Sequence, residues 1–290
     1  MKTKSNKIKD VLSYIDNELK NVYPKEEITA FKNILFDEYA DMNSAHLLAF
    51  MDDYINESSL LRIVLATEKL KKQVPIQYIL HHTQFLDLNI SLTTDVLIPR
   101  PETEELVSKI ITENKQRENL NIIDLCTGSG CIGLALNKFL KDSKVMALDV
   151  SPAALEVVKK NNKELGLVVE TMLFDLLNDD FSVFETMQPF DIIVSNPPYV
   201  MNKEKKEMQK NVLNYEPHLA LFVNDENPLV FYKKIAFFAQ KFLKKGGKVY
   251  LEINNSLSSQ TLTLFSQTEF IARIEKDIFD KERFIFLEKK

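Results

Sequence analysis

Strand-like and helix-like segments alternate along the last two thirds of this chain, and this alternation most constrains its fold. Apolar runs typical of strands cover residues 121–126, 144–149, 168–174, 190–195 and 248–253. Helix-length segments lie between most of them, at 132–140, 152–165 and 228–243, the last with Gly246-Gly247 as its expected stop. Two more expected strands, 270–275 and 283–288, follow. This alternation predicts an α/β fold with a mainly parallel sheet covered by helices on both faces.

The first 75 residues show a helical pattern instead. Apolar side chains recur at the i, i+3, i+4, i+7 spacing of one helix face, beginning with Ile8, Val11, Leu12, Ile15 and Leu19. Residues 76–98 partly alternate between apolar and polar, which predicts a short extended connector or a β-hairpin. We therefore expect a helical domain over 1–75, a connector over 76–100 and an α/β domain over 101–290.

The composition is that of an ordinary globular protein and excludes several classes. No apolar run approaches the ~20 residues that span a bilayer, and the polar start lacks a secretory signal. Cys126 and Cys131 lie too close within one element for a good disulfide, which fits a reducing compartment. The net charge of −5 argues against direct nucleic-acid binding, and no Cys or His cluster has metal-ligand spacing. We expect a cytoplasmic monomer with no membrane partner and no metal.

A glycine-rich loop joins the first α/β strand to the helix that follows. The segment from Asp124 to Gly133 places Gly128 and Gly130 where a ligand must touch backbone, and the helix start offers free N–H groups and a positive dipole end. Asp149 ends the next strand, about 20 residues on, the spacing of an acid that binds ribose hydroxyls. A nucleoside cofactor is therefore favoured over a purely structural glycine turn.

The loop alone matches a dinucleotide fingerprint as well as a methyltransferase loop. Asp124, at the strand end, would face the cationic amino-acid end of S-adenosylmethionine favourably, whereas it would repel a pyrophosphate. Asp175 follows the third expected strand, and two interpretations of it stay open: a neighbour of the adenine, or a cap of a helix or turn.

The motif Ser195-Asn196-Pro197-Pro198-Tyr199 follows an apolar strand and would lie beside the cofactor loop. An amide or aryl NH2 group is a poor nucleophile, and two acceptors on its hydrogens orient its lone pair. The Asn196 side-chain carbonyl and the Pro197 backbone carbonyl are suitable acceptors, held by the two prolines. Tyr199 would lie against the flat substrate group and favour a passing positive charge. The alternative is a proline turn that ends a strand.

These residues resemble the class I S-adenosylmethionine-dependent methyltransferases that act on planar NH2 groups. Three further segments, 74–80, 95–105 and 215–221, are similar to signature stretches of the release-factor glutamine methyltransferases. The resemblance covers nearly the whole chain. It implies a Rossmann-like sheet, mainly parallel with an antiparallel C-terminal strand, and methylation at N5 of the glutamine in the Gly-Gly-Gln tip of class I peptide chain release factors. It also implies that the helical domain helps dock this protein substrate.

The resemblance carries roles onto individual positions. The cofactor, S-adenosylmethionine, would be bound by Asp124, Cys126, Thr127, Gly128, Ser129, Gly130, Asp149, Asp175, Leu176 and Asn196. The catalytic group would be Asn196, Pro197 and Tyr199, and the substrate side would add Pro198, Arg100, Glu102 and Glu216. Arg100 could instead be a plain ion-pair partner of Glu102 or Glu104.

This sequence departs from the family pattern at four positions. Cys126, His81 and Asn254 stand where the family often has glycine, and Leu176 replaces a frequent aromatic residue. The charged run from Lys203 to Lys210 is expected to be a solvated loop, with a mobile lid as the alternative. Other functions left open are a glutamine methyltransferase that acts on a ribosomal protein, a DNA adenine methyltransferase, and a non-catalytic protein with a relic pocket.

Overall fold

The computed structural model describes residues 3–290, which form two compact units. The first comprises residues 3–80 together with Lys210–Tyr215, and the second comprises His81–Gln209 together with Glu216–Lys290. Helix α9 (Lys210–Tyr215) comes from the middle of the chain, so the units are not consecutive segments.

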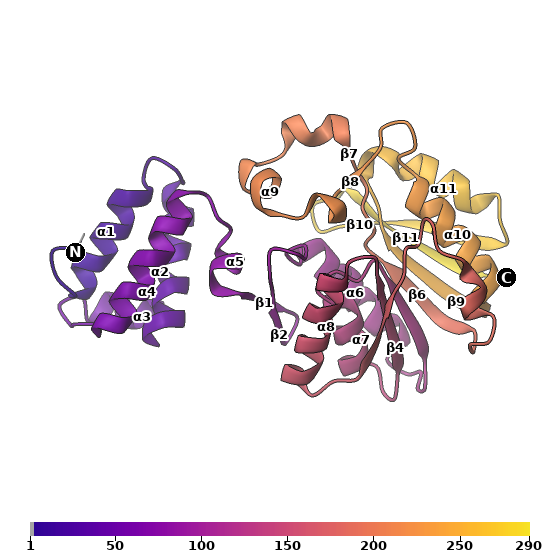
Figure 1. Cartoon of the computed structure of the whole chain (residues 1–290), viewed down its shortest axis with the longest axis horizontal. Helices are drawn as coiled ribbons and strands as arrows, with labels where there is room; N and C mark the ends of the chain where they lie inside the picture. Colours follow the sequence, from indigo (N-terminus) through magenta and orange to yellow (C-terminus); the bar gives the residue numbers. More distant parts are fainter. Residues whose placement is uncertain (1–2) are drawn as a thin grey trace. The chain divides into compact units, whose positions relative to one another are not determined.

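The first unit is mostly helical (indigo to purple in Figure 1). Besides α9 it contains α1 (Ile8–Leu19), α2 (Lys25–Ala40), α3 (Ser44–Ala49), α4 (Glu57–Lys71) and α5 (Ile76–Leu80). The stripe expected on the first helix lies in the core, where Ile8, Val11 and Ile15 have no exposed surface. The start of α4 is capped by Asn56, whose Oδ1 accepts the Ser59 N–H at 2.7 Å.

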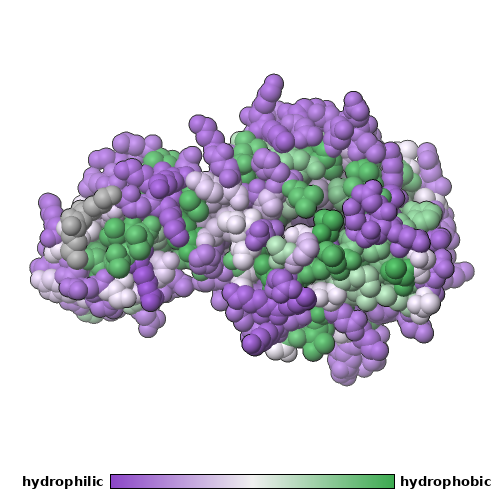
Figure 2. Space-filling model, viewed as in Figure 1, coloured by the Kyte–Doolittle hydropathy of each residue, from purple (hydrophilic) through white to green (hydrophobic). Residues whose placement is uncertain are grey.

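Apolar side chains also reach the surface of this unit. Figure 2 shows apolar areas among the polar and charged side chains that cover it. Leu48, Tyr54, Leu61 and Leu65 are each more than half exposed. These side chains are not part of the helical core. Large exposed apolar areas often mark surfaces that contact another protein.

The second unit is built on a seven-stranded sheet with the order β10-β11-β9-β6-β3-β4-β5. Its strands are β3 (Asn121–Leu125), β4 (Lys144–Asp149), β5 (Val169–Leu173), β6 (Phe190–Ser195), β9 (Leu243–Glu252), β10 (Phe270–Lys276) and β11 (Glu282–Lys289). Pairing is parallel from β9 to β5, whereas β11 runs antiparallel to both β9 and β10. The predicted α/β class and the antiparallel C-terminal strand are confirmed.

Helices cover both faces of this sheet (Figure 1). They are α6 (Pro101–Asn114), α7 (Cys131–Phe139), α8 (Pro152–Leu165), α10 (Val230–Phe242) and α11 (Ser258–Ser266). Successive strand residues point to opposite faces of the sheet. On one face Ile123, Leu125 and Ile193 pack with Phe238 of α10 in one buried cluster. On the other face the Tyr250 hydroxyl accepts a hydrogen bond from Asn114 of α6 at 3.0 Å.

Part of the expected connector forms a β-hairpin of β1 (His82–Phe85) and β2 (Leu88–Ser91), whereas its first residues form the helix α5 instead. The buried Asn161 of α8 fastens its end, because its Oδ1 accepts the Ser91 N–H at 2.8 Å and its Nδ2 donates to the Ser91 carbonyl at 3.2 Å. The same Nδ2 donates to the Ser129 carbonyl at 3.1 Å. One amide therefore joins the hairpin to the glycine loop and positions residues 92–100 beside that loop.

Two local expectations were wrong. Gly246-Gly247 does not stop the helix: α10 ends at Phe242, and the glycines lie within β9. Gly246 takes a left-handed φ of 71° within the part of β9 where the β6–β9 register shifts. This glycine therefore allows an irregular backbone in the strand. The charged run also differs from a plain loop, since Asn202–Glu207 forms a 3-10 helix, η2, between the short parallel strands β7 (Val200–Met201) and β8 (Phe222–Val223).

His81 adopts a left-handed φ of 66°, which explains why the family often has glycine there. A side chain in this conformation costs about 1–2 kcal/mol, and the extra freedom of an unfolded glycine offsets part of that gain. We expect His81→Gly to raise the unfolding free energy by about 0.5–1 kcal/mol in urea unfolding. His82→Gly, in the adjacent strand, should lower it. An equal change of the unfolding free energy in both variants would contradict the left-handed backbone of His81 as the cause.

Candidate active site

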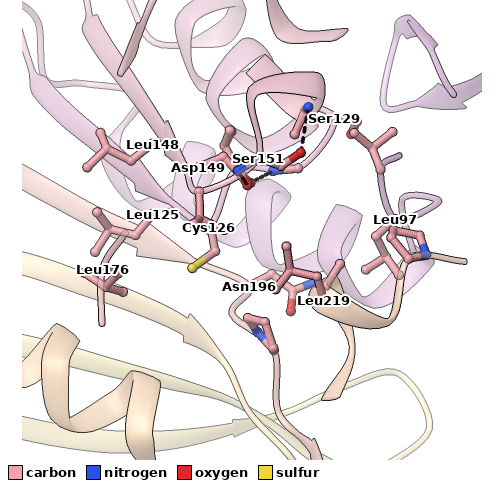
Figure 3. Close-up of a pocket in the computed structure, with 18 of the residues that line it drawn as sticks. Leu97, Leu125, Cys126, Ser129, Leu148, Asp149, Ser151, Leu176, Asn196 and Leu219 are labelled. Atoms are coloured by element: carbon pink, nitrogen blue, oxygen red, sulfur yellow. Dashed lines mark hydrogen bonds between the residues drawn. The ribbon is translucent and has the colours of Figure 1, made fainter. Parts of the chain in front are cut away.

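A cavity of about 510 Å³ opens where β3, β4 and β6 end, entirely within the second unit. This is the edge at which parallel α/β sheets bind ligands, and the volume falls in the usual range for small-molecule sites. In Figure 3, Leu125, Leu148 and Leu176 lie on one side of the site and Leu97 and Leu219 on the other. The cavity is therefore formed by the strand ends together with the connector and the segment after α9.

The glycine loop turns sharply beneath this cavity. Cys126, Gly128 and Gly130 have φ values of 60°, 56° and 80°, all left-handed. A Cβ at Gly130 would lie 2.9 Å from a Val158 methyl group, whereas a Cβ at Gly128 would meet no atom within 4 Å. Gly130 thus lets the loop pack on α8, and Gly128, which lines the cavity, leaves room for a ligand. The left-handed φ at Cys126 explains why relatives often have glycine there.

Asp149 links the end of β4 to this loop. Its Oδ2 accepts the Gly128 N–H and its Oδ1 accepts the Ser151 N–H, each at 2.9 Å (Figure 3). Burial raises the pKa of this carboxyl, and the backbone donors oppose the rise. A carboxylate has about four acceptor positions, so two remain after these bonds. Asp149 lines the cavity and has the acceptors needed for a pair of hydroxyl groups.

Asp124 does not line the cavity, contrary to our expectation. It is fully buried, and its Oδ2 accepts from the Thr127 hydroxyl at 2.5 Å and the Gly133 N–H at 3.1 Å. Its Oδ1 has no hydrogen-bond partner. Strand alternation explains this outcome, because Asp124 points to the α7 face while its neighbours face α10. Asp124 therefore holds the loop and the first turn of α7 in place.

The remaining predicted cofactor residues divide in the same way. Cys126, Thr127, Ser129 and Leu176 line the cavity, and Gly130 lies behind it. Asp175 lines the cavity as well, and it is also a turn cap: its Oδ1 accepts the Leu177 N–H at 2.8 Å. The hydrogen bond from the Asn178 side chain is the main cause that lowers the pKa of Asp175. The turn-cap interpretation of Asp175 is confirmed, and its place beside the adenine stays a prediction.

Two of the four residues of the Asn-Pro-Pro-Tyr motif after β6 line the cavity directly. Asn196 and Pro198 line the cavity, whereas Pro197 and Tyr199 do not. Asn196 Nδ2 donates to Thr103 Oγ1 at 3.1 Å, which leaves Oδ1 as the acceptor available to a substrate. The Tyr199 hydroxyl instead donates to Glu252 Oε1 at 2.7 Å. Tyr199 is therefore held by a buried carboxylate outside the cavity lining, and its stacking on a substrate stays a prediction.

Arg100 lies at the cavity, but its ion-pair partner is neither of the acids we considered. Its guanidinium pairs with Glu216 at 2.5 Å, and Glu216 also accepts the Ile98 N–H at 3.3 Å. Glu216 is buried and does not line the cavity, so it positions Arg100 from behind. Glu102 is also absent from the lining, and Glu104 accepts the Leu86 N–H at 2.6 Å.

Sequence reasoning missed several residues of the site. Among them Leu97, Thr103, Ser151, Phe231 and Leu219 line the cavity. The sequence did contain a signal for Thr103. It precedes Leu106, Val107 and Ile110 by three, four and seven residues, the spacing of one helix face, and so lies on the buried face of α6. The others come from segments whose place depends on long-range packing.

Comparisons with known proteins decide the family. Residues 102–219 match the Methyltransferase small domain. A release factor glutamine methyltransferase of Flavobacterium psychrophilum is 40% identical and covers 96% of this chain and 98% of its own length. One from Bacteroides thetaiotaomicron is 39% identical, with 95% and 98% covered. The chain belongs to the release factor glutamine methyltransferases. The resemblance carried by segments 74–80, 95–105 and 215–221 is confirmed.

A solved structure supports the fold of this release factor glutamine methyltransferase family member. A methyltransferase from Pyrococcus furiosus has a TM-score of 0.52 at 18% identity, with 79% of this chain and 96% of that chain covered. This likeness concerns the fold alone. Within residues 3–290, no helix is long and apolar enough to cross a membrane, and no group of three or more His, Cys, Asp or Glu side chains is placed to hold a metal ion.

The buried Asp124 gives stability a defined pH dependence. Burial raises its pKa from 3.8 to about 7, so between these values the folded protein binds one proton more than the unfolded chain. Stability from this group is present at low pH and is lost as pH rises through about 7. From about pH 5.5 to about pH 8, the unfolding free energy of wild type relative to Asp124→Asn should fall by about 2 kcal/mol. Urea unfolding at several pH values measures this difference, and a constant difference would contradict it.

Proposed function

We propose that this enzyme transfers a methyl group from S-adenosylmethionine to the side-chain amide nitrogen of a glutamine in a class I peptide chain release factor, in its Gly-Gly-Gln tip. The observation that carries the proposal is the position of Asn196. Its side chain lines the cavity that begins at the glycine loop, with Oδ1 as an uncommitted acceptor. The family to which the chain belongs supports the same reaction.

The residues present fit the cofactor. Asp149 keeps two acceptor positions for the ribose hydroxyls, and Gly128 leaves open space where a side chain would otherwise stand. Leu148, Phe174 and Leu176 supply an apolar side suited to a planar base. The cofactor, when bound, supplies an electrophilic methyl group on a sulfonium centre.

The protein then has to present the amide nitrogen. In the proposed reaction Asn196 Oδ1 accepts one amide hydrogen at the cavity. The Pro197 backbone carbonyl, although Pro197 does not itself line the cavity, accepts the other, which fixes the plane of the NH2 group. Pro197 and Pro198 restrict the backbone, so the two acceptors are held in place before substrate arrives. The rate gain comes mainly from alignment. A strong base is not required before transfer, because the nitrogen becomes acidic once it carries the methyl group.

The protein substrate is larger than the cavity and needs more surface. Arg100, held by Glu216, and the exposed Leu219 lie at the cavity and would receive the peptide around the glutamine. We assign docking of the rest of the release factor to the helical domain of residues 1–75, whose exposed apolar side chains suit a protein contact. The same proposal has the enzyme working as a cytoplasmic monomer, with no membrane and no nucleic acid as direct partner.

The first prediction concerns the cofactor. Asp149→Asn should weaken S-adenosylmethionine binding about 10- to 100-fold, because a hydrogen bond to a carboxylate contributes about 1.5–3 kcal/mol. Asp142→Asn, an equivalent change at an exposed turn before β4, should leave affinity unchanged. Isothermal titration of both variants measures this. Equal affinity of Asp149→Asn and wild type would remove Asp149 from the ribose site.

The second prediction concerns the reaction. Mass spectrometry of the release-factor tip peptide after incubation should show one methyl group on glutamine with wild type. Asn196→Ala should lower the rate about 100-fold, because the substrate amide is then no longer aligned with the methyl group. Parallel incubations contain a ribosomal protein or DNA, and methylation of either one alone would overturn the proposed substrate.

A further inference from the structure

A buried hydrogen-bond chain leads from the substrate motif into the protein. Asn196 Nδ2 donates to Thr103 Oγ1 at 3.1 Å, and the Thr103 hydroxyl donates to Glu252 Oε2 at 2.7 Å. The Tyr199 hydroxyl donates to the other carboxylate oxygen, Oε1, at 2.7 Å. Glu252 and Thr103 are 1% and 2% exposed. Both ends of the Asn-Pro-Pro-Tyr motif therefore converge on one carboxylate of β9.

With Glu252 ionised, the donors and acceptors of this chain have one consistent direction. An ionised carboxylate only accepts, so the Thr103 hydroxyl must give its single hydrogen to Glu252. Thr103 Oγ1 can then only accept from Asn196, and the amide must turn its NH2 end toward Thr103. Burial raises the pKa of Glu252, but hydrogen bonds from Tyr199 and Thr103 and the charge of Arg283 oppose the rise.

This direction matters because an asparagine amide has two ends of similar shape. With Nδ2 bound to Thr103, Oδ1 faces away from Thr103 and is left to accept from a substrate NH2. A reversed amide would turn its oxygen toward Thr103 Oγ1, which has no hydrogen left to donate, and would present its own NH2 donors to the substrate NH2 group. The neighbouring polar groups therefore require this orientation of the Asn196 amide.

We propose that Thr103 and Glu252 are positioning residues which set the side-chain orientation of Asn196, so that its oxygen receives the substrate amide. This rests on the proposed reaction. Neither residue needs to touch the reacting atoms: Thr103 acts through Asn196, and Glu252 acts through Thr103. The role requires a side chain at position 252 that only accepts hydrogen bonds, and a hydroxyl at position 103. A side chain of the same size without these groups would not fill it.

A second contact holds the backbone of the same motif. Asn254, two residues after Glu252, donates from Nδ2 to the Tyr199 carbonyl at 3.1 Å and to Glu204 Oε2 at 2.9 Å. Its Oδ1 accepts from the Ser256 N–H at 2.9 Å and from the Ser256 hydroxyl at 2.8 Å. With the backbone fixed in this way, the side-chain torsion of Asn196 is the remaining freedom, and the Thr103–Glu252 chain removes it.

The test compares matched variants in full-length enzyme with release factor as substrate. Thr103→Val keeps the shape but removes the hydroxyl, and should lower kcat about 10- to 100-fold with S-adenosylmethionine affinity within about 3-fold of wild type. Thr103→Ser should restore kcat to near the wild-type value. Thr112→Val, the same change at an exposed position on the same helix, should leave kcat unchanged. Full kcat in Thr103→Val would overturn the proposal.

Glu252→Gln tests the direction of the chain. A glutamine can turn its own NH2 group toward Thr103, which frees the Thr103 hydrogen to point at Asn196 and favours the reversed amide. We expect kcat to fall about 10-fold or more while thermal unfolding stays cooperative. Full kcat in this variant would show that direction is not imposed by the carboxylate.

A double-mutant cycle separates positioning from a merely structural role. In an Asn196→Ala background the amide is gone, so Thr103→Val should cause no further loss of kcat. A structural role predicts an additive loss and overturns the proposal. Failure of the proposed function looks different, because Asn196→Ala itself would then leave methylation of the release factor unchanged.

Discussion

The site depends on the register between the two central strands β3 and β6. Leu125 and Ser195 are opposite one another in this parallel pair, and the Ser195 hydroxyl donates to the Leu125 carbonyl at 2.6 Å. These two residues end their strands, so the glycine loop and the Asn-Pro-Pro-Tyr motif begin side by side. A slip of one residue would turn Asp124 and Asn196 to the wrong faces and separate the methyl donor site from the amide site.

Buried polar groups hold this edge rigid at a cost in stability. Asp124, Glu252 and Asn161 are almost without exposed surface, and each bonds to a segment that lines the cavity. Burying a carboxylate is unfavourable unless donors meet it, and Asp124 keeps one oxygen without a partner. Such an arrangement would be poor packing for stability alone. It makes sense where loops must keep their geometry before substrate binds.

Much of the fold and half of the site could be predicted from the sequence, because those features are local. Strand and helix periods placed β4, β6 and α8 at their observed bounds, and loop chemistry placed Gly128 and Asp149 at the cavity. The partner of Arg100 could not be predicted, since Glu216 lies 116 residues away and two acids stand closer in sequence. The hydrogen-bond partner of Tyr199 could not be predicted for the same reason, since its hydroxyl meets Glu252, 53 residues on.

The three departures from glycine have different physical consequences. Cys126 and His81 keep the left-handed backbone that glycine adopts freely, so they carry its strain. Asn254 has a φ of −71°, a value that any residue tolerates, so its side chain costs no strain there. That side chain makes the bonds that fix the Tyr199 carbonyl and Glu204. A glycine pattern in a family thus marks strain at two of these positions, whereas at the third the added side chain tightens the substrate motif.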